Sequence, residues 1–286
     1  MIQMPIGWGW DRLRTAAHDV GSSPDEEYWP GQVRRRAVPA LRRIGLTDLT
    51  QALASGLDDF KANRTDVIFL CVLYPAAGLV LWALASGYGL LPLVFPLASG
   101  FALLGPLAAL GLYEMSRRRE LGMETSWVDA FRVLRSPSIG AIALLGVSLV
   151  VLFVLWLMAA NIIYLWTLGP EPPQSLGGFL RAVFTTADGW IMIAAGLGIG
   201  FLFAVVVLAI SVVSFPLLLD RDTGVDTAVS FSVHSVRANP GPFAVWGMIV
   251  ASGLVLGSIP CLIGLVIVLP VLGHATWHLY RRLVRD

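Results

Sequence analysis

Hydrophobic and polar positions along this chain repeat one pattern three times. In each unit a short amphipathic segment comes first, followed by a hydrophobic span, a turn and a second hydrophobic span. Apolar side chains three or four positions apart in the short segments predict helices with one apolar face. The short segments are residues 47–63, 124–137 and 226–240.

The hydrophobic spans predict an all-α, polytopic membrane bundle of six transmembrane helices. An α-helix needs about 20 mostly apolar residues to cross the hydrocarbon layer. The last apolar run, 243–280, is too long for one crossing, and we expect Gly257, Ser258 and Pro260 to turn it into a hairpin. The six predicted spans are 67–86, 91–113, 138–164, 190–219, 243–257 and 259–280.

The three units are predicted to be helix-hairpin repeats, each preceded by a cytoplasmic amphipathic helix. Lys61, Arg135 and Arg237 take equivalent places, just before the outward span of each unit. All units have the same orientation, which predicts a rotation about an axis along the membrane normal. The transmembrane domain is residues 45–286, after a poorly structured cytoplasmic tail at 1–44, and its repeat units are 45–113, 122–219 and 224–283.

Two roles are open for the short helices. Each can lie in the headgroup region with its apolar face toward the lipid, or it can cap the cytoplasmic end of the bundle. Gly122 and Gly224 precede the second and third short helices and are predicted to leave the preceding span with a positive φ. The outer loop 169–189 carries apolar residues at helical spacing and is predicted to hold a surface helix.

Composition agrees with a membrane protein. The 286 residues are 56% hydrophobic and 14% charged, whereas a soluble domain carries about a quarter charged residues. The net charge is +1, and the basic residues gather in the N-terminal region, two loops and the C-terminal tail. That distribution leaves no basic face for nucleic acid. The expected partners are the lipid bilayer and, beyond it, other membrane proteins or a second copy.

Lys and Arg in the short loops predict the orientation. Every basic loop falls on one side of a six-span arrangement, so we expect a multi-pass protein of a bacterial inner membrane with both termini cytoplasmic. The first 31 residues lack the apolar stretch of a signal peptide. Cys71 and Cys261 are predicted at opposite ends of the bundle, too far apart for a disulfide.

His274 and His278 are the best candidates for a cofactor site. They are four residues apart and therefore share one face of a helix. Imidazole ligates haem iron, copper and zinc. Since no third ligand is evident, we favour the structural interpretation, in which both side chains bond to groups at the inner interface. No cofactor is therefore expected, and haem or a metal is the alternative.

Charged residues cluster where the second and fourth spans end. Glu114 and Arg118 have the spacing of a helical ion pair, with Arg119 beside them, and Asp220 and Arg221 end the fourth span. Ionisable groups at membrane depth are functional by default. Just outside the hydrocarbon core, ion pairs that hold helix ends together are the favoured interpretation.

Prolines interrupt several spans. Each one frees a backbone carbonyl that a neighbour must satisfy or a cavity must hydrate. Such breaks are typical of transport sites and are also common in ordinary bundles. The prolines are Pro75, Pro92, Pro96, Pro106, Pro216 and Pro270.

Four strings carry a resemblance to a known family. FPLASGF at 95–101, GLYE at 111–114, SFPLLLDR at 214–221 and GHATWHLYR at 273–281 resemble a bacterial family of predicted integral membrane proteins of unknown function. The resemblance runs from about Arg42 to the C-terminus. Such proteins are sometimes labelled cytochrome c oxidase subunit I-like, a label that implies more spans and several intramembrane histidines. The family has no established activity to transfer to this chain.

Catalytic motifs are absent from the sequence. It has no glycine-rich phosphate loop, no nucleophile with a neighbouring base and no CxxC pair, so no catalytic residue is predicted and an enzyme is the less favoured class. We expect a non-enzymatic accessory or scaffold protein of the inner membrane, or a small transporter. The alternative is a haem- or metal-binding redox component associated with respiration.

Overall fold

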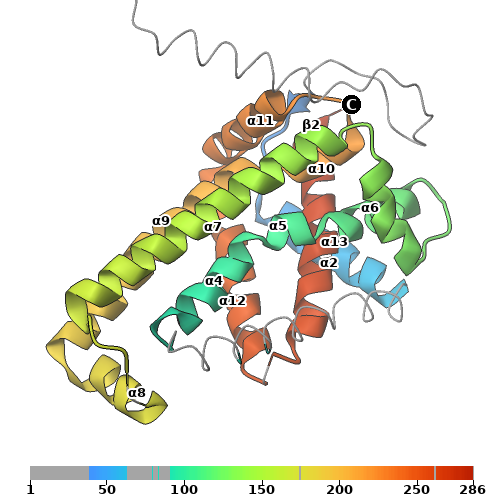
Figure 1. The fold of residues 1–286 in the computed structure, drawn as a ribbon. Coiled ribbons are helices and arrows are strands. Elements are labelled where there is room, and N and C mark those ends of the chain that lie inside the picture. The colour runs from blue at the N-terminus through green and yellow to red at the C-terminus, as the bar shows by residue number, and fades with distance from the viewer. Residues whose placement is uncertain are drawn as a thin grey trace, which may run out of the picture.

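A computed structural model describes residues 39–62, 79, 83, 91–173, 175–260 and 262–285. Both cysteines, most of the predicted N-terminal tail and, except for residues 79 and 83, the first predicted span lie outside these residues. The described chain is mainly helical, and its only strands form a two-residue β-ladder in which Ala40 pairs with Arg285 and Leu41 with Val284 (Figure 1). This ladder attaches the end of the predicted tail to the C-terminus.

The elements follow the order of the predicted pattern. The first part contains β1 (Ala40–Leu41), α2 (Leu46–Ala62), η1 (Leu91–Leu93), α4 (Val94–Leu103), α5 (Gly105–Ala108), α6 (Leu110–Glu120) and η2 (Trp127–Arg135). The second contains α7 (Ile139–Thr167), α8 (Leu176–Thr185), α9 (Ala187–Ser211), α10 (Ser214–Asp220), α11 (Val225–Ala238), α12 (Pro240–Ser258), α13 (Leu265–Leu283) and β2 (Val284–Arg285).

Three helical segments of the described chain are long and apolar enough to cross a membrane. They are Ile139–Thr167, Ala187–Asp220 (α9 continued by α10) and Pro240–Ser258. They confirm the third, fourth and fifth predicted spans. α7 and α9 run side by side as one long pair, and α8 lies at its far end (Figure 1). The predicted surface helix in the outer loop is therefore confirmed.

The second predicted span is wrong as a single helix. The chain from 91 to 120 is divided into η1, α4, α5 and α6. Gly105 and Pro106 open the short helix α5. Proline has no N–H to continue the preceding hydrogen bonds, and its ring clashes with the previous turn. The longest helix in the apolar part of this segment, α4, has only 10 residues and is too short to span a membrane.

The last apolar run, 243–280, turns where the sequence predicts, but the helix after the turn begins later than predicted. α12 ends at Ser258, and α13 begins at Leu265 rather than at 259. Leu262 has a φ of 67° in the intervening turn. α13 does not qualify as a span by length and composition, because its second half carries two histidines and two arginines. The six-span arrangement is thus shown only in part.

Gly122 and Gly224, both predicted to end a helix with a positive φ, differ in the structure. Gly122 has a φ of +72°, and its N–H donates to the carbonyl of Arg119 at 3.0 Å, which confirms the predicted helix end. Gly224 has a φ of −68° and instead precedes the first residue of α11. Arg221 is already extended, so the chain leaves α10 without a left-handed residue.

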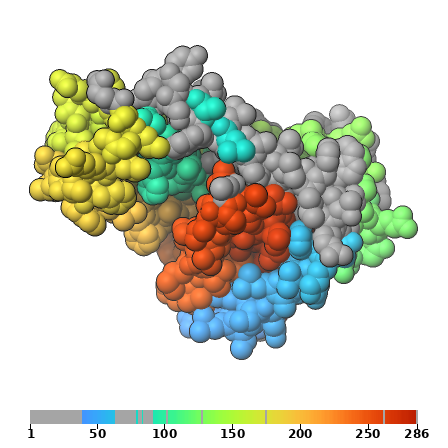
Figure 2. All heavy atoms as spheres, turned by 90° about the horizontal axis from the view of Figure 1, so that it is seen from below, coloured from blue at the N-terminus to red at the C-terminus, as the bar shows by residue number. Residues whose placement is uncertain are grey.

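Each short helix packs against the last helices of a different predicted unit. α2 lies along α13 (Figures 1 and 2), η2 lies on α6, and α11 lies on α9 and α10. Gly56 permits the closest of these contacts, since a Cβ there would lie 2.5 Å from the backbone nitrogen of Ala275. The buried face of α2 therefore packs against α13.

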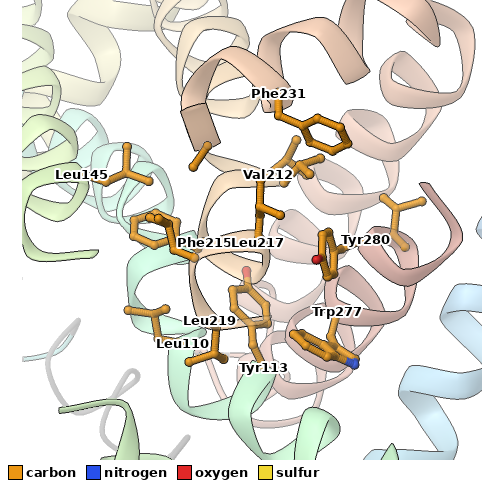
Figure 3. Close-up of a cluster of buried hydrophobic side chains, with 14 of the residues drawn as sticks. Leu110, Tyr113, Leu145, Val212, Phe215, Leu217, Leu219, Phe231, Trp277 and Tyr280 are labelled. Atoms are coloured by element: carbon orange, nitrogen blue, oxygen red, sulfur yellow. The ribbon is translucent and has the colours of Figure 1, made fainter. Parts of the chain in front are cut away.

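The core sits where α6, α10 and α13 meet. Phe215, Leu217 and Leu219 of α10 are fully buried, and Figure 3 shows them in one cluster with Tyr113 of α6 and Tyr280 of α13. Burying one such side chain contributes about 1.5–3 kcal/mol. This packing fixes the ends of three helices whose charged residues form the clusters described below.

Candidate functional site

Asp59 is the centre of a polar network that joins α2, α6 and α13. Its side chain is 7% exposed, and Oδ2 accepts hydrogen bonds from Ser116 Oγ at 2.6 Å and His278 Nε2 at 2.8 Å. Arg119 Nη1 donates a hydrogen bond to Oδ1 and forms an ion pair with the carboxylate. One carboxylate thus connects donors from two other helices.

His274 extends the network into the interior. It is fully buried, and its Nδ1 lies 2.8 Å from Ser116 Oγ. The Ser116 hydroxyl has one proton, which it donates to the ionised Asp59. His274 Nδ1 must therefore carry a proton and donate to Ser116 Oγ. The hydrogen bonds run in one direction, from His274 through Ser116 to Asp59.

The network keeps Asp59 ionised. Burial alone would raise the pKa of Asp59, but the hydrogen bonds from His278 and Ser116 and the nearby imidazole charges outweigh that effect. The pKa therefore lies below its ordinary value of 3.8. A carboxylate that accepts several hydrogen bonds is favoured in its charged form.

Local helix geometry explains why these side chains meet. Ser116 and Arg119 lie one turn apart on α6, and His274 and His278 lie one turn apart on α13. Residues three or four apart share a helix face. Because Gly56 has no side chain, α2 approaches α13 closely enough for Asp59 to lie between the two pairs.

Sequence reasoning identified three members of this network and missed two. It selected His274, His278 and Arg119, and missed Asp59 and Ser116. The sequence does contain a signal for Asp59. Asp59 is next to Phe60, on the face of α2 that also carries Leu49. A carboxylate on an otherwise apolar face indicates a buried partner.

The predicted ion pair between Glu114 and Arg118 is wrong. Glu114 instead forms two hydrogen bonds with Arg117, at 2.7 and 3.0 Å, and these side chains are 0% and 3% exposed. Arg118 lies 3.5 Å from Asp129 of η2. The reason is rotation around α6, which turns Arg117 into the core and Arg118 toward η2.

A second polar cluster joins the ends of α6, α10 and α13. Asp220 accepts a hydrogen bond from the Tyr280 hydroxyl at 2.6 Å, and the guanidinium groups of Arg221 and Arg281 each lie 3.6 Å away. Arg281 also binds Glu120 at 2.9 Å. The structure therefore brings the predicted Asp220 and Arg221 together with three partners that sequence reasoning missed.

The ring nitrogens of the two histidines form hydrogen bonds with different residues. His278 Nε2 binds Asp59 and His274 Nδ1 binds Ser116. Across the part of the chain that the structure describes, no group of three or more His, Cys, Asp or Glu side chains is arranged to hold a metal ion. Haem or metal binding by His274 and His278 remains a sequence-based prediction.

The chain matches the model of a family described as predicted integral membrane protein (DUF2189) over residues 94–220. This confirms the predicted resemblance across three of its four strings, and the match is shorter than the expected range from Arg42 to the C-terminus. Neither the curated proteins nor the solved structures contain a match to this chain. Together with the apolar helices, the family match identifies an integral membrane protein of unknown function. Asp59, His274 and His278 lie outside the matched residues.

Proposed function

We propose that this protein is a small, non-enzymatic transporter whose transport step moves a proton through the Asp59 network. The observation that carries the proposal is the buried series of hydrogen bonds from His274 through Ser116 to Asp59. An imidazole can carry a proton on either ring nitrogen, and a hydroxyl both donates and accepts.

The proton balance of the step is simple. His274 takes up a proton at its buried Nε2 as its Nδ1 proton leaves for Ser116 Oγ, so that the imidazole ends neutral, and the Ser116 proton moves to Asp59. Ser116 gains one proton and loses one, and Asp59 ends protonated. Asp59 then releases the proton toward water beside Arg119, whose side chain is 41% exposed.

Broken helices beside the network support transport. Pro270 lies inside α13, one turn before His274, and leaves the carbonyl of Val266 without its helical N–H. Gly105 and Pro106 break the helix that leads to Ser116. Interrupted helices at membrane depth are tolerated where neighbours or a water-lined path satisfy the backbone.

The proposed topology places the network on the cytoplasmic side of a bacterial inner membrane. Arginines concentrate at the end of the molecule where α6, α10 and α13 finish, which the positive-inside rule assigns to the cytoplasm. At the other end Trp166 is 88% exposed and Trp190 is 57% exposed. Exposed tryptophans are typical of a membrane–water interface.

We infer that the three units are repeats arranged in a ring. The short helix of each unit contacts the inward-running end of the unit before it: η2 on α6, α11 on α9 and α10, and α2 on α13. The last contact returns from the third unit to the first. A rotation axis along the membrane normal would produce this order.

Proton movement tests the proposal directly. Purified protein in vesicles that contain a pH-sensitive dye is expected to speed internal acidification under an imposed proton gradient. Asp59→Asn should remove that activity, whereas Asp58→Asn should keep it, because Asp58 is exposed and pairs only with Lys61 among the described ion pairs. Equal acidification with and without protein, or with both variants, would contradict the proposal.

The alternative is a redox component that binds haem or a metal through His274 and His278. It predicts a visible absorption band in the purified protein that His274→Ala removes. A colourless protein without bound metal would exclude it.

An accessory or scaffold role is the other non-enzymatic candidate. The wide exposed apolar surface of α7, α9 and α12 supports it, since such faces bind membrane partners as well as lipid. It predicts vesicles that show no proton movement.

A further inference from the structure

The 3₁₀ helix η2 has three distinct faces. A 3₁₀ helix has three residues per turn, so side chains three positions apart lie in one row. Ala130 and Val133 form a buried row. Val128, Phe131 and Leu134 form an apolar row, with exposures of 53%, 52% and 67%. Asp129, Arg132 and Arg135 form an ionic row.

The buried row fixes the direction of the other two. A Cβ on Gly111 of α6 would lie 2.7 Å from the Cβ of Ala130, so the two helices are in close contact. Val133 belongs to the main core. With this row fixed against the bundle, the apolar row points outward.

The ionic row has an excess of positive charge. Asp129 pairs with Arg132 at 2.7 Å and with Arg118 at 3.5 Å, and its carboxylate also accepts the backbone N–H of Ser126. Arg135 is exposed at the end of the row. Two arginines thus pair with one carboxylate, and a third, Arg135, lies at the end of the same row.

η2 lies just before a helix that can cross the membrane. Three residues after η2 the chain enters α7, a 29-residue apolar helix that can cross the membrane. η2 is therefore held at the level where a membrane span begins. Exposed apolar side chains beside arginines are the features of a helix that lies in the interface and attracts anionic lipid.

We propose that η2 is a membrane-surface anchor, with Val128, Phe131 and Leu134 inserted among the acyl chains. In this arrangement Arg132 and Arg135 bind the phosphates of anionic phospholipids. The occupant is the anionic lipid layer that α7 crosses. This site is independent of the proposed proton movement, because none of these residues belongs to the Asp59 network.

Spin-label accessibility tests the anchor in the full chain. Labels at Phe131→Cys, Leu134→Cys and, as the matched control, Arg132→Cys are compared in a Cys71→Ser/Cys261→Ser background. In phosphatidylglycerol-containing vesicles, labels at 131 and 134 should be accessible to oxygen and protected from a water-soluble nickel chelate. The label at 132 should be reached by the chelate several-fold more readily.

Two further measurements make the result decisive. Arg132→Gln/Arg135→Gln should reduce the protection at 131, and vesicles of phosphatidylcholine alone should do the same, because both remove the charge attraction. Equal chelate access at 131, 134 and 132 in protein that elutes as wild type does would overturn the proposal. Protection that disappears when the protein is diluted in lipid would also overturn it, because a second copy would then be the occupant.

Discussion

At the scale of single residues, Asp59 holds α2, α6 and α13 together. Its carboxylate accepts hydrogen bonds from Ser116, His278 and Arg119. Hydrogen bonds to a charged group contribute about 1.5–3 kcal/mol each when measured by mutation. Removing the charge therefore affects three contacts between helices at once.

The pH dependence of stability follows from the lowered pKa of Asp59. Because the pKa in the folded protein lies below 3.8, the unfolded chain takes up the proton first as the pH falls. The stabilisation is complete above about 3.8 and is lost as the pH falls through the lower, folded value. Asp59→Asn should lower the melting temperature at pH 6 and reduce its change between pH 5 and 3, about the range over which such carboxylates act.

The control for this measurement is Asp58→Asn, on the same turn of α2. Its side chain is 68% exposed, and a surface substitution typically changes stability by less than about 0.5 kcal/mol. Identical acid profiles for the wild type and Asp59→Asn would show that the network does not stabilise the fold through this charge.

The buried pair of Glu114 and Arg117 gives a second prediction at this scale. Removing one partner of a buried ion pair costs about 3–5 kcal/mol, so Glu114→Gln should unfold at a clearly lower temperature. Arg118→Gln loses only a longer, 3.5 Å pair with Asp129 and should cost less. The opposite order in thermal denaturation would instead support the pair predicted from sequence, Glu114 with Arg118.

At the scale of elements, uninterrupted apolar runs were predictable and broken ones were not. α7, α9 and α12 are recognisable because their apolar residues continue for the length of a membrane. The chain from 91 to 113 is also apolar and uncharged, but Gly105 and Pro106 determine where its helices stop. A proline indicates a possible break, and only packing against the neighbouring helices decides between a kink and an end.

The site was harder to predict than the helices because its members are distant in sequence. Ser116 is 57 residues from Asp59 and 158 residues from His274. Periodicity shows which residues share a helix face, such as His274 and His278, but not which helix that face meets. The pairing of α2 with α13 depends on the contact between Gly56 and Ala275, for which the sequence holds no local signal.

That contact predicts the effect of a single methyl group. Gly56→Ala should force α2 away from α13, because the new Cβ would lie 2.5 Å from the Ala275 nitrogen. Overpacking of this kind costs about 1–3 kcal/mol. Gly177→Ala in α8 has no neighbour within 4 Å and is the matched control, with a neutral or slightly raised melting temperature. Equal stability of the two variants would mean that α2 moves freely along α13.

At the scale of the whole molecule, the second polar cluster connects three helices that lie far apart in the sequence. Glu120 ends α6, Asp220 ends α10, and Arg281 of α13 contacts both carboxylates, at 2.9 and 3.6 Å. The apolar core of Figure 3 lies directly beside this cluster, where Tyr280 donates to Asp220. The helix ends should therefore loosen together rather than singly.

Hydrogen exchange on Arg281→Gln tests this coupling. Loss of the guanidinium removes a shared partner of Glu120 and Asp220, so amide exchange should increase in both α6 and α10, although the substitution is in α13. Arg282→Gln is the matched control, because Arg282 contacts Gln51 and Asp48 of α2 and should raise exchange there alone. Since local opening exposes whole cooperative units, an increase confined to α13 in Arg281→Gln would mean that the three helix ends are stabilised independently by their apolar packing.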